Sequence, residues 1–190
     1  GSIAAEIVLV LSNVPAAGAL VRAEKAGIAT TVIDHRTFAE RADFDRAVVA
    51  ALQAASVDLV VLAGFMRLIT APFIAAFPDR IINIHPALLP AFPGLHVQKK
   101  ALEAGARFSG CTVHFVDGGV DTGPIIIQAV VPILDDDDEA SLSARILVQE
   151  HRIYPRAIQL IAEGRLRIEG RRVRIAAAVV DGVMVNPPLN

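Results

Sequence analysis

The chain has 190 residues, a formal net charge of −2 at pH 7 and 54% hydrophobic residues. This length suits one domain with a substantial apolar core, and the balanced charge argues against a surface built for nucleic acid. The single cysteine, Cys111, excludes an internal disulfide and a thiolate metal cluster, so we interpret it as a small buried apolar residue.

Nothing in the sequence predicts targeting or membrane insertion. The strongest apolar run, residues 57–65, is bracketed by Asp58 and Arg67 and falls well short of the roughly 18 residues that cross a bilayer. No basic segment followed by a hydrophobic stretch predicts secretion. We therefore expect a cytoplasmic protein that has neither a membrane nor a nucleic acid as its partner.

Strand and helix signals alternate along the chain. Strands covered on both faces are typically continuous apolar runs, whereas helices carry apolar residues three or four apart and often end at glycine. On these grounds we predict strands at 6–13, 28–34, 57–65, in the first part of 80–90, at 110–116 and at 124–133. The same signals predict helices at 17–27, 44–55, 72–77, 96–105 and 139–163.

This alternation predicts an α/β fold with a mainly parallel, twisted sheet and helices on both of its faces. In such folds ligands bind beyond the carboxyl ends of the strands. After the long helix, RLRIEGRRVRI (165–175) predicts a C-terminal β-hairpin with Gly170 in its turn. No linker or internal repeat is visible, so we expect one domain over 1–190, with a C-terminal tail at about 176–190.

The stretch RIINIHPALLP (80–90) is the first candidate for chemistry. Asn83 and His85 alternate with isoleucines, so on a strand they share one face, and Pro86 follows at once. An amide can donate to a developing oxyanion, and an imidazole can act as an acid or a base near neutral pH. A lone strand histidine is more often a hydrogen-bonded core residue, but the position at a strand end favours a site.

The second candidate is VDGGVDTGPII (116–126). Asp117 and Asp121 flank a Gly-Gly turn, beside a predicted strand that carries His114. Aspartate next to glycine is ordinary turn chemistry, which is the simpler interpretation for either residue. A carboxylate held near an imidazole would, however, raise the pKa of that imidazole and fix its tautomer.

The third candidate is Glu150 on the long helix. The apolar stripe of this helix comprises Leu142, Ile146, Ile153, Ala157 and Leu160. Glu150 shares the register of that stripe, and a carboxylate that faces a core needs a partner or a ligand. The alternative is a glutamate at the edge of the stripe that reaches solvent. Pro155 is expected to kink or interrupt the helix.

Other patterns have simpler interpretations. A hydrolytic zinc site could use His85, His96, His114 and Asp121, but their spacing matches no common zinc motif, so we favour a metal-free acid/base site. We interpret the acidic run 135–138 as a solvated loop before a helix. The arginines after residue 164 are interpreted as the hydrated edge of the hairpin rather than a nucleic-acid patch.

Four motifs carry a resemblance to a known family. They are VVLAGFMRLI, INIHPALLPAFPGLH, GCTVHFVDGGVDTGPIIIQ and QEHRIYP. They resemble the phosphoribosylglycinamide formyltransferase family, folate-dependent enzymes of purine synthesis, in order from about residue 6 to about residue 170. The resemblance implies a Rossmann-like formyltransferase fold. It also implies 10-formyltetrahydrofolate as co-substrate, glycinamide ribonucleotide as acceptor, no metal, and a monomer or homodimer.

The resemblance also implies roles for single residues. The catalytic set would be Asn83, His85 and Asp121. The folate pocket would be lined by Arg41, Arg67, Leu68, Ile69, Val116, Asp117, Gly118, Gly119 and Val120. The ribonucleotide would contact Met66 and, through its ribose hydroxyls, Glu150. The Leu89–Pro90 peptide bond would be cis.

The implied reaction is direct attack of an amine on the formyl carbon through a tetrahedral intermediate. Asn83 and protonated His85 would donate to the oxyanion, while Asp121 would keep His85 protonated and help to move the proton. The alternatives are a 10-formyltetrahydrofolate hydrolase and a non-catalytic folate- or nucleotide-binding module. The family pattern opens with a strand and a phosphate-binding loop that this chain does not contain, and we expect an incomplete sequence to be the reason.

Overall fold

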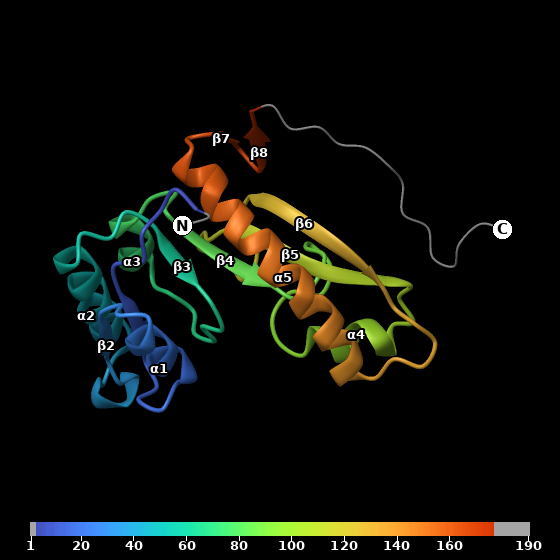
Figure 1. The fold of residues 1–190 in the computed structure, drawn as a ribbon, viewed down its shortest axis with the longest axis horizontal. Helices are drawn as coiled ribbons and strands as arrows, with labels where there is room; N and C mark the ends of the chain where they lie inside the picture. Colours follow the sequence, from blue (N-terminus) through green and yellow to red (C-terminus); the bar gives the residue numbers. More distant parts are fainter. Residues whose placement is uncertain (1–2, 177–190) are drawn as a thin grey trace. The chain divides into compact units, whose positions relative to one another are not determined.

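The computed structural model describes residues 3–176 and divides the chain into two compact units, whose elements are labelled in Figure 1. The N-terminal unit comprises residues 6–81. The C-terminal unit comprises residues 82–176 together with 3–5, which join it through a 2.6 Å hydrogen bond from the Ala4 N–H to Gln159 Oε1. The single domain expected over 1–190 stays a prediction, and residues 177–190 of the expected tail lie outside the described residues.

The N-terminal unit is built on a parallel strand–helix–strand pair. Its elements are β1 (Val10–Ser12), α1 (Gly18–Lys25), β2 (Thr30–Val32), the 3-10 turn His35–Thr37, α2 (Arg41–Ala54), β3 (Val60–Leu62) and α3 (Ala71–Ala76). These follow the predicted order, but the strands are shorter than predicted. β1 and β2 pair over only three residues each, which leaves Ile7 and Val8 exposed instead of extending a strand over 6–13.

Two helices of this unit are held together by a buried acid. Asp45, on α2, is 2% exposed and accepts a 2.6 Å hydrogen bond from the Thr70 N–H at the start of α3. Phe44 and Val48, on the same helix, are also buried. An aspartate carboxylate is tolerated there because it accepts a backbone donor that would otherwise have no helical partner.

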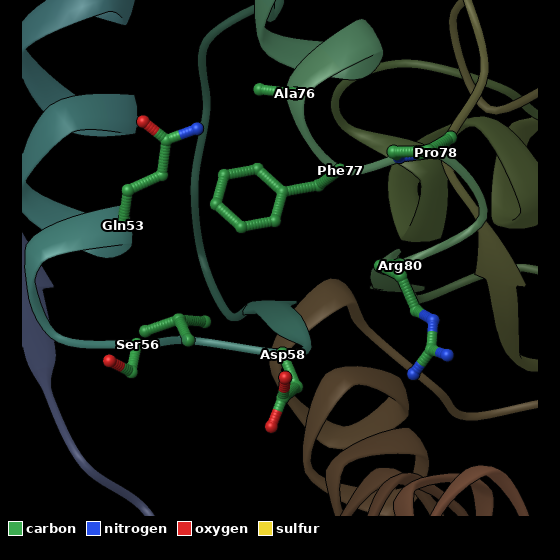
Figure 2. A pocket seen from close by; sticks show the side chains of 8 residues that line it. Gln53, Ser56, Asp58, Ala76, Phe77, Pro78 and Arg80 are labelled. Atoms are coloured by element: carbon green, nitrogen blue, oxygen red, sulfur yellow. The ribbon is translucent and has the colours of Figure 1, made fainter.

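An open hollow of about 520 Å³ lies in this unit (Figure 2). The Phe77 ring faces it between Gln53 and Ser56 from the end of α2 and Arg80 from the segment before the next strand. Its lining contains none of the predicted site residues.

The C-terminal unit carries a larger sheet. Its elements are β4 (Ile81–His85), α4 (Val97–Glu103), β5 (Phe108–Phe115), β6 (Ile125–Pro132), α5 (Glu139–Ala162), β7 (Leu166–Glu169) and β8 (Arg172–Ile175). The pairs β4–β5, β5–β6 and β7–β8 are antiparallel, and β6 pairs with β8 in parallel at one position. The predicted hairpin is confirmed, with Gly170 at φ +61° in its turn.

The core of this unit lies between the sheet and the long helix. α5 packs on β5 and β6. The buried cluster comprises Ala101, Cys111, Val131, Ile133, Leu142 and Ile146. Cys111 is fully buried, as interpreted from the sequence, and burial raises the pKa of its thiol to about 12.

The long helix differs from the sequence expectation in one respect. α5 runs through Pro155 as one helix of 24 residues, so the expected interruption does not occur. A proline removes one hydrogen bond to the carbonyl four residues earlier, here that of His151, an exposed residue whose carbonyl water can hydrate. No helix within residues 3–176 combines the length and the apolarity that crossing a membrane requires.

The acidic run before α5 is more structured than a solvated loop. Asp138 caps the helix in a reciprocal capping box with Ser141. The Asp137 side chain is only 2% exposed, and it accepts hydrogen bonds of 2.5 and 2.9 Å from the Arg145 guanidinium. It also accepts from the Leu134 N–H at 2.8 Å. The solvated interpretation is therefore wrong for Asp137, because a basic residue two turns into the helix folds back onto it.

We expect Asp137→Asn to lower the stability at neutral pH by about 1.5–3 kcal/mol, since hydrogen bonds to charged groups contribute on that scale. The bond from Arg145 holds the pKa of Asp137 below its usual value. This stabilisation is therefore present above the usual carboxyl range and is lost as the pH falls through the depressed pKa. Thermal unfolding as a function of pH measures the effect.

The control is Asp136→Asn, which neutralises the exposed neighbouring carboxylate and should change the unfolding temperature little. If the unfolding temperatures of wild type and Asp137→Asn differed by the same amount in strong acid as at neutral pH, the ionised Asp137 carboxylate would not be the source of the stabilisation.

Candidate active site

Strand β4 presents the first two candidate residues. Asn83 lies directly opposite His114 on the antiparallel neighbour β5, and His85 lies opposite Thr112. Ile82 is fully buried and His85 is 4% exposed, while Asn83 is half-buried. Because Asn83 and His85 lie two positions apart in one strand, they share a face of the sheet, and the register adds His114 to the same cluster.

Asp121 joins this cluster from the loop between β5 and β6. Its Oδ2 lies 3.4 Å from His85 Nδ1, and its Oδ1 lies 3.7 Å from His114 Nε2. Oδ2 also accepts a 2.9 Å hydrogen bond from the Gly94 N–H. Asp121 has a left-handed backbone at φ +54°, a conformation that aspartate adopts more readily than most residues. The structure thus brings the three predicted catalytic residues together.

Both ring nitrogens of His85 face acceptor oxygens. Its Nε2 is 2.9 Å from the Phe92 carbonyl oxygen, which can only accept, so Nε2 carries a hydrogen. The other nitrogen, Nδ1, faces the Asp121 carboxylate, which also accepts when ionised. A hydrogen on Nδ1 would therefore point at the Asp121 carboxylate.

The loop that follows β4 is anchored to the sheet at several points. Thr112 Oγ1 donates to the Ala87 carbonyl at 2.7 Å and accepts from the Leu89 N–H at 3.1 Å. Gln128 Nε2 donates to the Leu89 carbonyl at 2.9 Å. The Leu89–Pro90 bond is cis, as the resemblance implies. These contacts fix the segment that carries the Phe92 carbonyl.

Sequence reasoning placed His114 beside the loop that carries Asp121 but gave it no catalytic role. Its Nδ1 donates to the Phe115 carbonyl at 2.7 Å, and its Nε2 lies 3.4 Å from Asn83 Nδ2. Burial lowers the pKa of His114, against the opposing effects of its backbone hydrogen bond and of Asp121. The signal that would have found it is the pairing of β4 with β5, which a single sequence does not display.

Glu150 comes to the same unit from α5. It is half-buried, and burial raises the pKa of its carboxyl despite the attraction of His151 and His85. One turn further on, the Tyr154 hydroxyl donates to the Ile82 carbonyl at 3.2 Å, which ties α5 to β4. The register read from the apolar stripe is confirmed, since Leu142, Ile146, Ala157 and Leu160 are buried.

The predicted folate loop, 116–120, is a tight turn next to Asp121. Asp117 accepts from the Gly119 N–H at 3.0 Å and from Thr122 Oγ1 at 2.6 Å. Although burial acts in the opposite direction, these hydrogen bonds lower the pKa of Asp117. A Cβ on Gly119 would lie 2.0 Å from Thr122 Oγ1, so a larger residue there would displace the Thr122 hydroxyl that donates to Asp117. Val120 remains 46% exposed.

The remaining predicted residues belong to the N-terminal unit. Arg67 places its guanidinium carbon 5.2 Å from the centroid of the Phe44 ring. Its Nε is buried without a hydrogen-bond partner among residues 3–176. Met66 and Leu68 are exposed, and Arg41 is exposed at the start of α2. Their roles, and that of Ile69, stay predictions. Within the described residues, no group of three or more histidine, cysteine or acidic residues is arranged to hold a metal ion.

Comparison with known proteins gives a consistent set of relatives. Residues 1–158 match the family described as formyl transferase. The chain is 42% identical over 178 residues to the phosphoribosylglycinamide formyltransferase of Escherichia coli strain K12, covering 94% of this chain and 82% of that protein. The crystal structure of glycinamide ribonucleotide transformylase 1 from Symbiobacterium toebii matches with a TM-score of 0.87 at 56% identity, covering 88% of this chain and 79% of that one. The expected α/β class is thereby confirmed.

A longer relative contains only a short matching region. The chain is 57% identical over 160 residues to the trifunctional purine biosynthetic protein adenosine-3 of Drosophila melanogaster. That match covers 84% of this chain but only 12% of the length of that protein.

Glu150→Gln is expected to raise the stability of the unliganded protein at neutral pH, because it removes a half-buried charge. Burial raises the pKa of Glu150, so the protonated carboxyl contributes to the stability of the fold at low pH. This contribution is lost as the pH rises through that raised pKa. The unfolding temperature should therefore rise by about 2–4 °C, the shift that roughly 1 kcal/mol produces at this size. The gain should fade in acid.

Glu24→Gln, at an exposed position on α1, is the matched control and should leave the unfolding temperature nearly unchanged. A lower unfolding temperature for Glu150→Gln at neutral pH would show that the Glu150 carboxylate stabilises the unliganded fold instead of destabilising it.

Proposed function

The chain belongs to the formyl transferase family, and from this we propose that it transfers a formyl group from 10-formyltetrahydrofolate to the amine of glycinamide ribonucleotide in purine synthesis. The observation that carries the proposal is the convergence of Asn83, His85 and Asp121 in one buried cluster. The names of the Escherichia coli and Symbiobacterium toebii relatives support the same donor–acceptor class.

The geometry suits a reaction in which negative charge develops on oxygen. When the amine nitrogen bonds to the formyl carbon, the C=O electron pair moves to oxygen and a tetrahedral intermediate forms. The Asn83 amide donates a hydrogen bond to that oxyanion. The positive charge of His85, whose two ring nitrogens face Phe92 and Asp121, stabilises the oxyanion electrostatically. Contacts of this kind lower a barrier by about 3–4 kcal/mol each where water is excluded.

Asp121 has two tasks in this mechanism. Its carboxylate holds His85 as the imidazolium through the 3.4 Å contact, and the Gly94 N–H keeps the carboxylate in place. It also accepts the proton that the attacking amine must lose, directly or through water, and returns it to the departing folate nitrogen as the C–N bond breaks. The proton is conserved, and the enzyme ends in the state in which it began.

The family resemblance assigns substrate contacts to residues of both units. The half-buried Glu150 carboxylate lacks full hydration and so is ready to accept hydrogen bonds from ribose hydroxyls. The loop 116–120, next to Asp121, would contact the folate, together with Arg41 and Arg67–Ile69. Met66, 76% exposed, would contact the ribonucleotide.

We expect His85→Ala and Asp121→Asn each to lower kcat for formyl transfer by about 10²–10⁴-fold, the usual contribution of a positioned acid or base. The assay follows folate product formation with both substrates present, and Asp136→Asn serves as the carboxylate control. Transfer at the wild-type rate in either variant would overturn the proposed roles. If formate were released at the transfer rate without an amine acceptor, the chain would be a hydrolase instead. If the chain bound folate without any turnover, it would be a binding module.

Glu150→Gln should raise KM for glycinamide ribonucleotide by about 10–100-fold, because a hydrogen bond to a charged group contributes about 1.5–3 kcal/mol. KM for the folate should change little. Initial rates with each substrate varied in turn give both constants. Since the same substitution is expected to stabilise the unliganded protein, a loss of affinity cannot be attributed to unfolding. An unchanged ribonucleotide KM would remove Glu150 from that site.

A further inference from the structure

The two histidines of the cluster are held in different protonation patterns. His114 Nδ1 lies 2.7 Å from the Phe115 carbonyl oxygen, which can only accept, so Nδ1 carries the hydrogen. In the neutral ring, Nε2 then has a lone pair and no hydrogen. Because His114 is only 2% exposed, water has little access to compete for that lone pair.

This lone pair decides which way the Asn83 amide turns. Asn83 lies directly opposite His114, and its Nδ2 is 3.4 Å from His114 Nε2. Nδ2 can donate to the lone pair, whereas the amide oxygen in the same place would be repelled by it. A neutral His114 therefore selects one of the two amide orientations. In that orientation the second N–H of Nδ2 is left to donate elsewhere.

We propose that His114 is a positioning residue that, as a neutral hydrogen-bond acceptor, holds the Asn83 amide with its second N–H directed at the formyl oxygen. This rests on the proposed function only for the identity of that oxygen. Without His114, the amide can turn and present its own oxygen to the developing negative charge. That orientation would repel the transition state instead of stabilising it.

Protonation of His114 would reverse the arrangement. The charged groups around its ring are Asp121 and Asp117 from the loop and His85 from β4. A hydrogen on Nε2 would point toward Asp121 Oδ1, 3.7 Å away, and would repel the Asn83 N–H. Asp121 would then be shared between two cations. Burial lowers the pKa of His114, which keeps the ring neutral near physiological pH.

A double-mutant cycle tests the proposal. We expect His114→Leu to lower kcat by about 10–100-fold with both KM values nearly unchanged, and by no more than Asn83→Ala, since losing a whole oxyanion donor costs about 10²–10³-fold. In the Asn83→Ala background, His114→Leu should cost less than about 3-fold. Equal losses in both backgrounds would show that His114 does not act through Asn83 and would overturn the proposal.

Two further variants separate positioning from packing. His114→Gln supplies a carbonyl acceptor that does not titrate, and it should recover most of the kcat that His114→Leu loses. It should also remove any fall in kcat at low pH that is caused by protonation of His114. His35→Leu is the matched control, because His35 Nδ1 forms the same kind of pair with Asn13 Nδ2 at 3.0 Å, away from the proposed catalytic residues in the sequence. It should leave kcat unchanged. Failure of His114→Gln to recover activity while folded would contradict the acceptor role.

Nitrogen NMR gives a readout that does not depend on turnover. In the wild-type protein, His114 should show a protonated Nδ1 and an unprotonated Nε2, and the Asn83 side-chain amide resonances should shift when His114 is protonated in acid. If formyl transfer is absent but this coupling is present, the proposed function fails and the positioning inference stands. An Nε2-protonated tautomer of His114 at neutral pH, or Asn83 resonances that ignore it, would overturn the inference.

Discussion

Two buried histidines, His85 and His114, lie 3.4 and 3.7 Å from the carboxylate of Asp121, so their hydrogens can be arranged in few ways. Each ring already gives one hydrogen to a backbone carbonyl, His85 to Phe92 and His114 to Phe115. The Asp121 carboxylate can stabilise a second hydrogen on one of the rings, and His85 Nδ1 is the nearer, at 3.4 Å against 3.7 Å. The proposed roles of the two rings therefore differ: His85 pairs with the carboxylate, and His114 is the neutral acceptor for Asn83.

The fold supplies this arrangement through non-local contacts. The antiparallel pairing of β4 with β5 sets Asn83 against His114, and the loop after β4 is held by Thr112 and Gln128 from the neighbouring strands. The Gly94 N–H from that loop reaches the Asp121 carboxylate. Segments far apart in the sequence thus hold each other in place, which gives the preorganisation that the proposed stabilisation of an oxyanion requires.

Local patterns were enough to predict part of this structure. The order of elements, the shared face of Asn83 and His85, the register of Glu150 and the hairpin at Gly170 all follow from periodicity and turn chemistry within a few residues. The antiparallel pairing of β4, β5 and β6, and with it the place of His114, depends on partners that periodicity does not identify. The burial of Asp137 likewise depends on Arg145, whose side chain folds back from the helix. Strand lengths depend on pairing too, which is why β1 is shorter than its apolar run.

The left-handed backbone at Asp121 limits what evolution or engineering can place there. At φ +54°, asparagine and aspartate are tolerated far better than residues with longer or branched side chains. Glutamate would keep the charge, but it would add a methylene next to two buried rings and strain the main chain. Aspartate therefore combines a carboxylate with the backbone conformation that this loop needs. In an alignment of relatives, an Asp-to-Glu exchange at this position would be a radical change, despite its place among conservative substitutions.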